Sequence, residues 1–155
     1  MKLLILAPCD KVIIDKLGNP SLISIIQNLN VEVPADNPVP SNAVVPREWY
    51  IFSHWLVADE EIGREFVQRT VIVLPSGDVF GDPATGSSVP FKAKDISANI
   101  AQVIVNLNGF PIGMAGPITV KVWIEEGGKS VTDVIAYPLR VVHVEPKTPV
   151  TALTS

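Results

Sequence analysis

The stretch PITVKVWIE, residues 117–125, decides the fold of this chain. Aliphatic side chains stand at every second position, at Ile118, Val120, Val122 and Ile124. Successive side chains of a β-strand point to opposite faces of the sheet, so this period of two predicts a strand with one face in a hydrophobic core. Trp123 belongs to the other face and is expected to point away from that core.

Most other apolar segments show the same period, and turn signals separate them. Gly127-Gly128 follows the quoted stretch and is the strongest hairpin signal in the chain. Pro138, inside the last long apolar run, indicates an edge, a bulge or a strand that changes sheets. Only residues 58–63 suggest a helical turn. Further strands are predicted within residues 3–14, 22–26, 47–57, 64–74, 98–107 and 131–144.

Seven to nine strands without crossover helices predict an all-β fold, an antiparallel two-sheet sandwich with an immunoglobulin-like or jelly-roll topology. A single sandwich domain is expected over residues 1–144. Residues 34–46 contain four prolines and are expected to form a stiff surface loop. Residues 145–155 lack a core pattern and are expected to form a flexible tail.

The composition limits the partners. Hydrophobic residues make up 47% of the chain and charged residues 18%, with a net charge of −4. No run of Lys or Arg offers a phosphate-binding surface, which argues against nucleic acid. No apolar stretch approaches the roughly 20 residues that span a bilayer, so no membrane partner is expected. The sparse charges indicate either a large core or an apolar surface that meets a protein partner.

The segment around Cys9, the only cysteine, bears on the compartment. The apolar run of residues 3–7 is shorter than the roughly 7–15 residues of an export signal. We therefore expect a cytoplasmic protein, or one assembled from the cytoplasm into a virion or a surface structure. Cys9 is interpreted as a small buried residue rather than a lipidated or reactive thiol.

The aromatic stretch 47–57 is apolar on both faces when it is built as a strand. Trp49, Ile51 and Trp55 share one side, and Tyr50 and Phe52 share the other. A role in the core is favoured, with an oligomer contact or a sugar-stacking platform as the alternative. Together with the connection at residues 108–116 and the strand that follows it, this stretch supplies the candidate interface residues. They are Trp123, Phe110, Ile112, Met114, Trp49, Tyr50, Phe52 and Trp55.

The sequence offers no catalytic constellation. His54 and His143 lack a metal-ligand spacing such as HExxH, and residues 59–61 lack the alternating ligands of a calcium loop. Residues 78–86 contain no phosphate-loop lysine and are interpreted as a hairpin end and loop. No serine stands in a GxSxG elbow. We therefore predict no catalytic, metal-binding or cofactor-binding residue, and no cofactor.

Two segments carry a resemblance to a family. They are LILAPCDKVIIDKLGNPSLISII near the start, and NGFPIGMAGPITVKVWIEEGG followed by YPLRVVHV near the end. The chain resembles a set of small bacterial proteins known only as a domain of unknown function, which have an early Cys-Asp strand and a YPLRVV-like last strand. The resemblance covers residues 3–144. It implies a β-sandwich and supplies no catalytic residue.

The leading hypothesis is a non-enzymatic structural or protein-interaction module in a homo-oligomer or a larger bacterial or phage assembly. Its contact is expected to use Trp123 with the nearby connection, or the strand at residues 49–57.

Two other classes of protein stay open. A lectin-like sandwich would bind a carbohydrate or another small ligand, with Trp49, Tyr50, Trp55 or Trp123 stacking on the sugar. A hydrolase or metalloenzyme on the same scaffold would need His54 or His143 beside two carboxylates.

Overall fold

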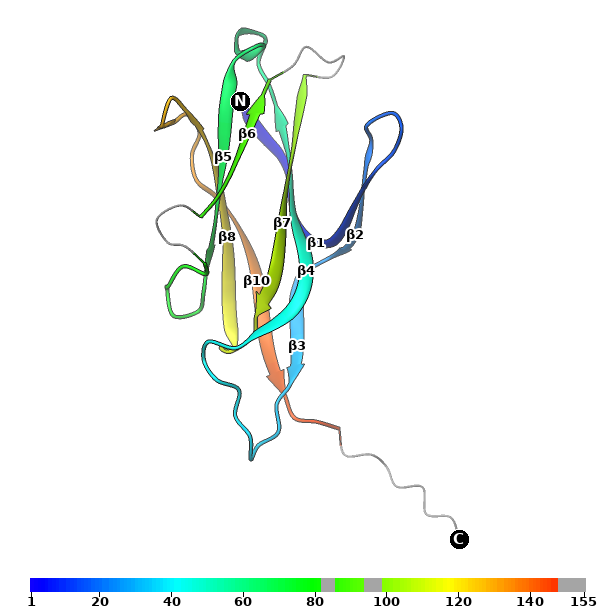
Figure 1. The fold of residues 1–155 in the computed structure, drawn as a ribbon, viewed down its shortest axis with the longest axis vertical. Helices are drawn as coiled ribbons and strands as arrows, with labels where there is room; N and C mark the ends of the chain where they lie inside the picture. Colours follow the sequence, from blue (N-terminus) through cyan, green and yellow to red (C-terminus); the bar gives the residue numbers. More distant parts are fainter. Residues whose placement is uncertain (82–85, 94–98, 148–155) are drawn as a thin grey trace.

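The structure, a computed structural model, describes residues 1–81, 86–93 and 99–147 and arranges them in two β-sheets (Figure 1). The strands are β1 Lys2–Ile14, β2 Pro20–Ile25, β3 Asn28–Glu32, β4 Val44–Leu56, β5 Glu65–Val73, β6 Ser87–Lys92, β7 Ile100–Pro111, β8 Gly116–Glu126, β9 Lys129–Ser130 and β10 Ile135–Val144. A 3-10 turn, η1, covers Asp59–Glu61. The first sheet has the order β2-β1-β4-β7, and the second has the order β3-β10-β8-β5-β6 with β9 beside β8. The predicted all-β fold with two sheets is confirmed.

The two sheets share one hydrophobic core. The aliphatic residues of β8 are all at most 1% exposed, at Ile118, Val120, Val122 and Ile124. The alternation that predicts this strand therefore also predicts its buried face. From the opposite sheet, Trp49, Ile51 and Trp55 of β4 join the same cluster. Burial of each aliphatic side chain contributes roughly 1.5–3 kcal/mol, and each aromatic ring buries more area.

The sheets differ from the prediction in one pairing and in the number of strands. β3 runs parallel to β10, with Leu29 opposite Val141, whereas every other strand pair in the described residues is antiparallel. The chain crosses from the first sheet to the second between Ile25 and Asn28, and the buried Ile26 lies at the crossing. The described residues form ten strands, because the short strands β3, β6 and β9 add to the seven predicted segments.

The proline-rich parts of the chain lie where hydrogen bonding tolerates them. Pro138 in β10 is opposite Thr119 of β8, and β3 covers β10 only from Arg140 onward. On the edge of β10 that faces away from β8, no described strand therefore flanks Pro138. This position suits a residue without an N–H group. The predicted loop at residues 34–46 ends early, because β4 begins at Val44. Of the predicted tail, residues 148–155 lie outside the described residues.

A buried polar network joins the two sheets across the core. Ser53 Oγ donates a hydrogen bond to Gln68 Oε1 at 2.6 Å, and Trp55 Nε1 donates to the same oxygen at 2.7 Å. Gln68 Nε2 in turn donates to Thr70 Oγ1 at 3.2 Å. Ser53 and Trp55 belong to β4, and Gln68 belongs to β5 of the other sheet. The network therefore fixes how the two layers face each other.

Candidate interaction surface

The β1–β2 hairpin departs from the plane of its sheet. β1 pairs with β4 from Lys2 to Cys9, and with β2 from Cys9 to Ile14. An ion pair between Asp10 and Arg47 of β4 lies where the two pairings meet. Figure 1 shows β1 and β2 continuing beyond this point as a separate hairpin beside the two layers.

The tip of the hairpin folds back onto the outer face of the first sheet. Gln102 Nε2 of β7 donates a hydrogen bond to the carbonyl oxygen of Gly18 at 2.8 Å. Gln102 is opposite His54, and two residues further along, Ile104 is opposite Phe52. These four side chains share one face, because alternate residues of a strand point the same way. The hairpin therefore lies over the face that carries Phe52.

The turn at the tip is held by its own side chains. Asp15 Oδ1 accepts hydrogen bonds from the backbone N–H groups of Leu17 and Asn19, both at 2.8 Å. Asn19 Nδ2 donates to Asp15 Oδ2 at 3.0 Å. These bonds, those from Asn19 first, lower the pKa of the Asp15 carboxyl. The tip is thus an ordered turn that can present Leu17 in a fixed position.

The hairpin presents much of the exposed apolar surface of the described chain. Eleven large hydrophobic residues are exposed among the described residues, and seven of them lie between positions 4 and 25. We call five of these the hairpin surface: Ile13, Ile14, Leu17, Ile23 and Ile25. Residues 17–26 contain no charged side chain. Scattered apolar residues are normal on a protein surface, and their concentration here makes the hairpin the candidate interaction surface.

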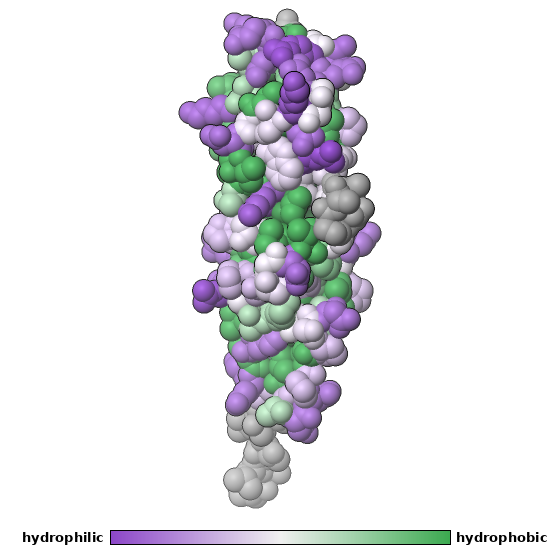
Figure 2. All heavy atoms as spheres, turned by 90° about the vertical axis from the view of Figure 1, so that its left-hand side faces the viewer, coloured by the Kyte–Doolittle hydropathy of each residue, from purple (hydrophilic) through white to green (hydrophobic). Residues whose placement is uncertain are grey.

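On the surface of the second sheet, apolar and hydrophilic side chains alternate more than they do on the hairpin. Figure 2, which looks onto the left-hand side of Figure 1, shows apolar patches separated by hydrophilic side chains. Trp123 of β8 alternates with the buried residues of that strand and is half-buried, and its Nε1 donates to Glu125 Oε1 at 3.0 Å. Arg69 Nε donates to Glu125 Oε2 at 2.9 Å. Hydrogen bonds from Arg69 and Trp123 lower the pKa of the Glu125 carboxyl.

Half of the eight sequence-predicted interface residues are interior. Trp49, Phe52, Trp55 and Phe110 are 0% exposed, so they have no surface to offer a partner in this conformation. Tyr50, Ile112, Met114 and Trp123 are half-buried. Tyr50 and Trp123 lie on different sheets. The four aromatic residues proposed to stack on a sugar therefore form no exposed pair. The core role favoured for the aromatic strand is confirmed for Trp49 and Trp55.

A small apolar cleft opens at one end of the two sheets. It has a volume of about 230 Å³, and Met114 is among the residues that line it. Val44 of β4, Phe80 after β5 and Pro111 of β7 line it as well. Its size and lining suit a single aliphatic or aromatic group. The acidic loop predicted at residues 78–86 borders this cleft up to Gly81, and residues 82–85 lie outside the described residues.

The two histidines do not converge. His54 lies in the first sheet, and its Nε2 is buried without a hydrogen-bond partner among the described residues. Burial lowers the pKa of this imidazole. His143 lies in the second sheet, 2.7 Å from the carbonyl oxygen of Ile112. Since a carbonyl oxygen only accepts, His143 Nε2 carries the proton. In the described part of the chain, no three His, Cys, Asp or Glu residues are grouped as metal ligands.

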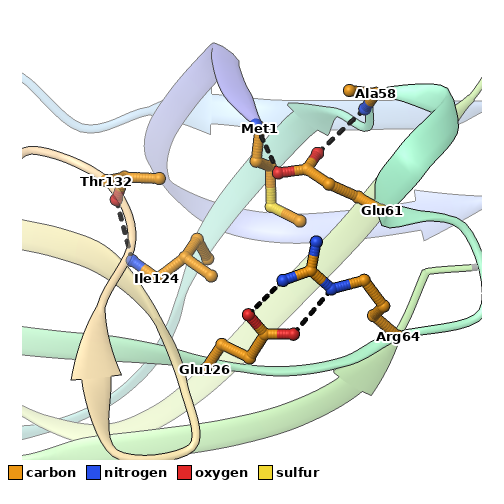
Figure 3. A network of polar contacts seen from close by, with 7 residues as sticks. All are labelled: Met1, Ala58, Glu61, Arg64, Ile124, Glu126 and Thr132. Atoms are coloured by element: carbon orange, nitrogen blue, oxygen red, sulfur yellow. Dashed lines mark hydrogen bonds and ion pairs between the residues drawn. The ribbon is translucent and has the colours of Figure 1, made fainter.

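The acidic turn η1 takes part in polar contacts rather than forming a free acidic cluster (Figure 3). Glu61 accepts hydrogen bonds from the α-amino group of Met1 at 2.7 Å and from the backbone N–H of Ala58 at 2.9 Å. Nearby, the guanidinium of Arg64 binds both oxygens of Glu126, with Nε 2.7 Å from Oε1. The hydrogen bonds from Arg64 lower the pKa of the Glu126 carboxyl. These contacts tie η1 and the start of β5 to neighbouring strands.

Cys9 lies at the bend where the hairpin leaves the sheet and is 0% exposed. Burial raises the pKa of its thiol, against a smaller lowering by the hydrogen bond from the Lys11 backbone. A buried, protonated thiol is a poor nucleophile. The interpretation of Cys9 as a buried residue is confirmed.

We expect Cys9 to react with a disulfide reagent about 100-fold more slowly in the folded protein than in denaturant, because reaction requires opening of the bend. Release of thionitrobenzoate with and without guanidinium measures this ratio. Equal rates would show that the bend opens freely.

The comparisons with known proteins leave the family open. No family model matches this chain, and a search among curated proteins finds no relative. Membership of the bacterial family that the sequence resembles stays a prediction. Among the described residues, no helix has the length and apolar character needed to cross a membrane.

Proposed function

We propose that this protein is a non-enzymatic structural or protein-interaction module that works within a homo-oligomer or a larger bacterial or phage assembly. The observation that supports this proposal is the exposed aliphatic surface of the β1–β2 hairpin, in a region without charge from residue 17 to residue 26. Surfaces of this kind are costly to keep in water and are characteristic of contact sites. We place the protein in the cytoplasm or in a virion assembled there.

We also propose an immunoglobulin-like topology rather than a jelly roll. In immunoglobulin domains the order A-B-E holds in one sheet and C-F-G in the other. The order β1-β4-β7 corresponds to A-B-E, and the order β5-β8-β10 corresponds to C-F-G. β6 then extends the second sheet beside β5, as strand C′ does in variable-type domains.

The proposal is tested by the assembly state of the purified protein. We expect native mass spectrometry and light scattering to show an oligomer at about 50 µM, with a midpoint of dissociation in the micromolar range. Because the proposed contact is aliphatic, added salt is not expected to dissociate it. A wild-type protein that is monomeric at several hundred micromolar would contradict self-association.

A further inference from the structure

We infer that protonation of His54 releases the β1–β2 hairpin from the outer face of the first sheet. The inference concerns a movement within one chain, goes beyond the proposed function and does not rest on it. Release moves the hairpin surface relative to the two sheets, so mild acid changes the surface that the protein presents.

The first observation is the burial of one nitrogen of the His54 ring. Nε2 is buried and has no hydrogen-bond partner among the described residues. The ring of Phe52, which is 0% exposed on the same face, lies 4.7 Å away between centroids. The neutral imidazole can carry its single proton on Nδ1 and leave only a lone pair at Nε2. The protonated ring carries a proton on both nitrogens, which places a charged donor without an acceptor in this buried position.

The second observation is that the hairpin is fastened beside this ring. Gln102 of β7 is directly opposite His54 of β4, which brings their Cβ atoms to roughly 5 Å. The side chain of Gln102 donates the 2.8 Å hydrogen bond to the carbonyl oxygen of Gly18 at the tip. A charge on His54 therefore develops next to the contact that holds the tip. When the tip moves away, water can reach Nε2 and the charged ring regains the hydration that burial removes.

The charged groups around this face do not offset that cost. The titratable and charged residues on the surrounding elements are Lys2, Cys9, Asp10 and Lys11 of β1, Arg47, Glu48 and Tyr50 of β4, and Asp15 and Lys16 at the tip; β2 and β7 contain none. The carboxylates among them already have partners. Asp10 pairs with Arg47, Glu48 accepts hydrogen bonds from Tyr50 and Asn106, and Asp15 accepts those of its own turn.

The sign of the pH dependence follows from the burial of the ring. Burial lowers the pKa of His54 in the docked state, whereas an exposed imidazole titrates near its ordinary value of about 6.5. The released state therefore binds the proton more tightly than the docked state. Docking is fully stable above the ordinary value and weakens as the pH falls below it.

The thiol of Cys9 reports whether the hairpin is released. Cys9 is 0% exposed and is opposite both Tyr50 of β4 and Ile25 of β2, where the hairpin leaves the sheet. The experiment measures its reaction with dithiodipyridine, a disulfide reagent that also works in acid, between about pH 5 and pH 8. Each rate is divided by the rate in guanidinium at the same pH, which removes the titration of the thiol itself. We expect the normalised rate of the wild type to rise by about three- to tenfold from pH 8 to pH 5.

Three variants assign this change to His54. His54→Phe and His54→Gln have no titrating group at this position, and we expect their normalised rates to vary by less than about twofold over the same range. His143→Gln is the matched control, because it removes the other histidine of the chain and should keep the wild-type rise. Far-UV circular dichroism at each pH shows that the sheets stay folded, and either His54 variant carries the test if the other does not fold.

The outcomes are distinct from those that test the proposed function. A rise that is lost in the folded His54 variants and kept in His143→Gln supports release by His54. A wild-type rate that is flat across the range overturns it, and so does a rise that persists without His54 or disappears without His143. A wild-type protein that is monomeric contradicts self-association and leaves this inference standing, because the release takes place within one chain.

Discussion

Replacing Trp49 by Ala is expected to lower the free energy of unfolding by about 4 kcal/mol. The ring is 0% exposed and lies 4.8 Å from the ring of Phe110, measured between centroids. Its Nε1 donates a hydrogen bond to the carbonyl oxygen of Gly109 at 2.9 Å. The substitution removes the apolar contacts, leaves a cavity and leaves that buried oxygen without its donor. Equilibrium unfolding in guanidinium, followed by far-UV circular dichroism, measures the loss.

The matched control for this substitution is Trp123→Ala. Trp123 is half-buried on the outer face of β8, and its Nε1 bonds to Glu125, which Arg69 also binds. We expect less than half of the loss found for Trp49→Ala, because no closed cavity forms. If the two substitutions cost the same, Trp49 is not the core residue that its burial indicates. If the alanine variant does not fold, Trp49→Phe, which keeps an aromatic ring but lacks the N–H group, is used to measure the loss of stability.

The aromatic strand shows how far the sequence alone predicts this structure. The period of two correctly places Trp49, Ile51 and Trp55 on one side of β4 and Phe52 on the other. It cannot say what covers the side of Phe52, because both faces of the strand are apolar. The tip of the β1–β2 hairpin reaches this face at Gln102, through Gly18, which lies more than thirty residues before Phe52 in the chain. Local patterns define strands and faces, but contacts of this separation depend on the tertiary fold.

The candidate surface was only partly predictable for the same reason. The sequence predicts strands at residues 3–14 and 22–26, and β1 and β2 form there. Continuous apolar sequence is typical of a strand buried on both faces, so nothing local distinguishes the exposed Ile23 from a core residue. β3 escaped prediction because its two half-buried apolar residues, Leu29 and Val31, stand among asparagines. Its place depends on parallel pairing with β10, at the far end of the chain.

Replacing Gln68 by Ala is expected to lower the free energy of unfolding by about 3 kcal/mol. Gln68 is 0% exposed, and its Oε1 accepts hydrogen bonds from Ser53 Oγ and Trp55 Nε1. The alanine variant loses these bonds and leaves a cavity between the sheets. Gln68→Met keeps most of the volume and loses only the polar contacts, so we expect a loss of about 2 kcal/mol. The difference between the two variants measures the cavity.

A double-mutant cycle with Ser53→Ala shows whether the polar contacts act as a network. In the methionine variant Ser53 Oγ loses its partner on Gln68 and keeps two longer bonds, both 3.3 Å: it donates to the carbonyl oxygen of Val103 and accepts from Trp55 Nε1. Once Gln68 is gone, removing the hydroxyl also removes a poorly satisfied buried group. The double variant should therefore cost less than the sum of the two single variants, by about 1 kcal/mol. Strict additivity would mean that the Ser53–Gln68 contact contributes nothing to holding the two sheets together. The facing of β4 and β5 would then depend on apolar packing and on the hydrogen bond from Trp55 to Gln68.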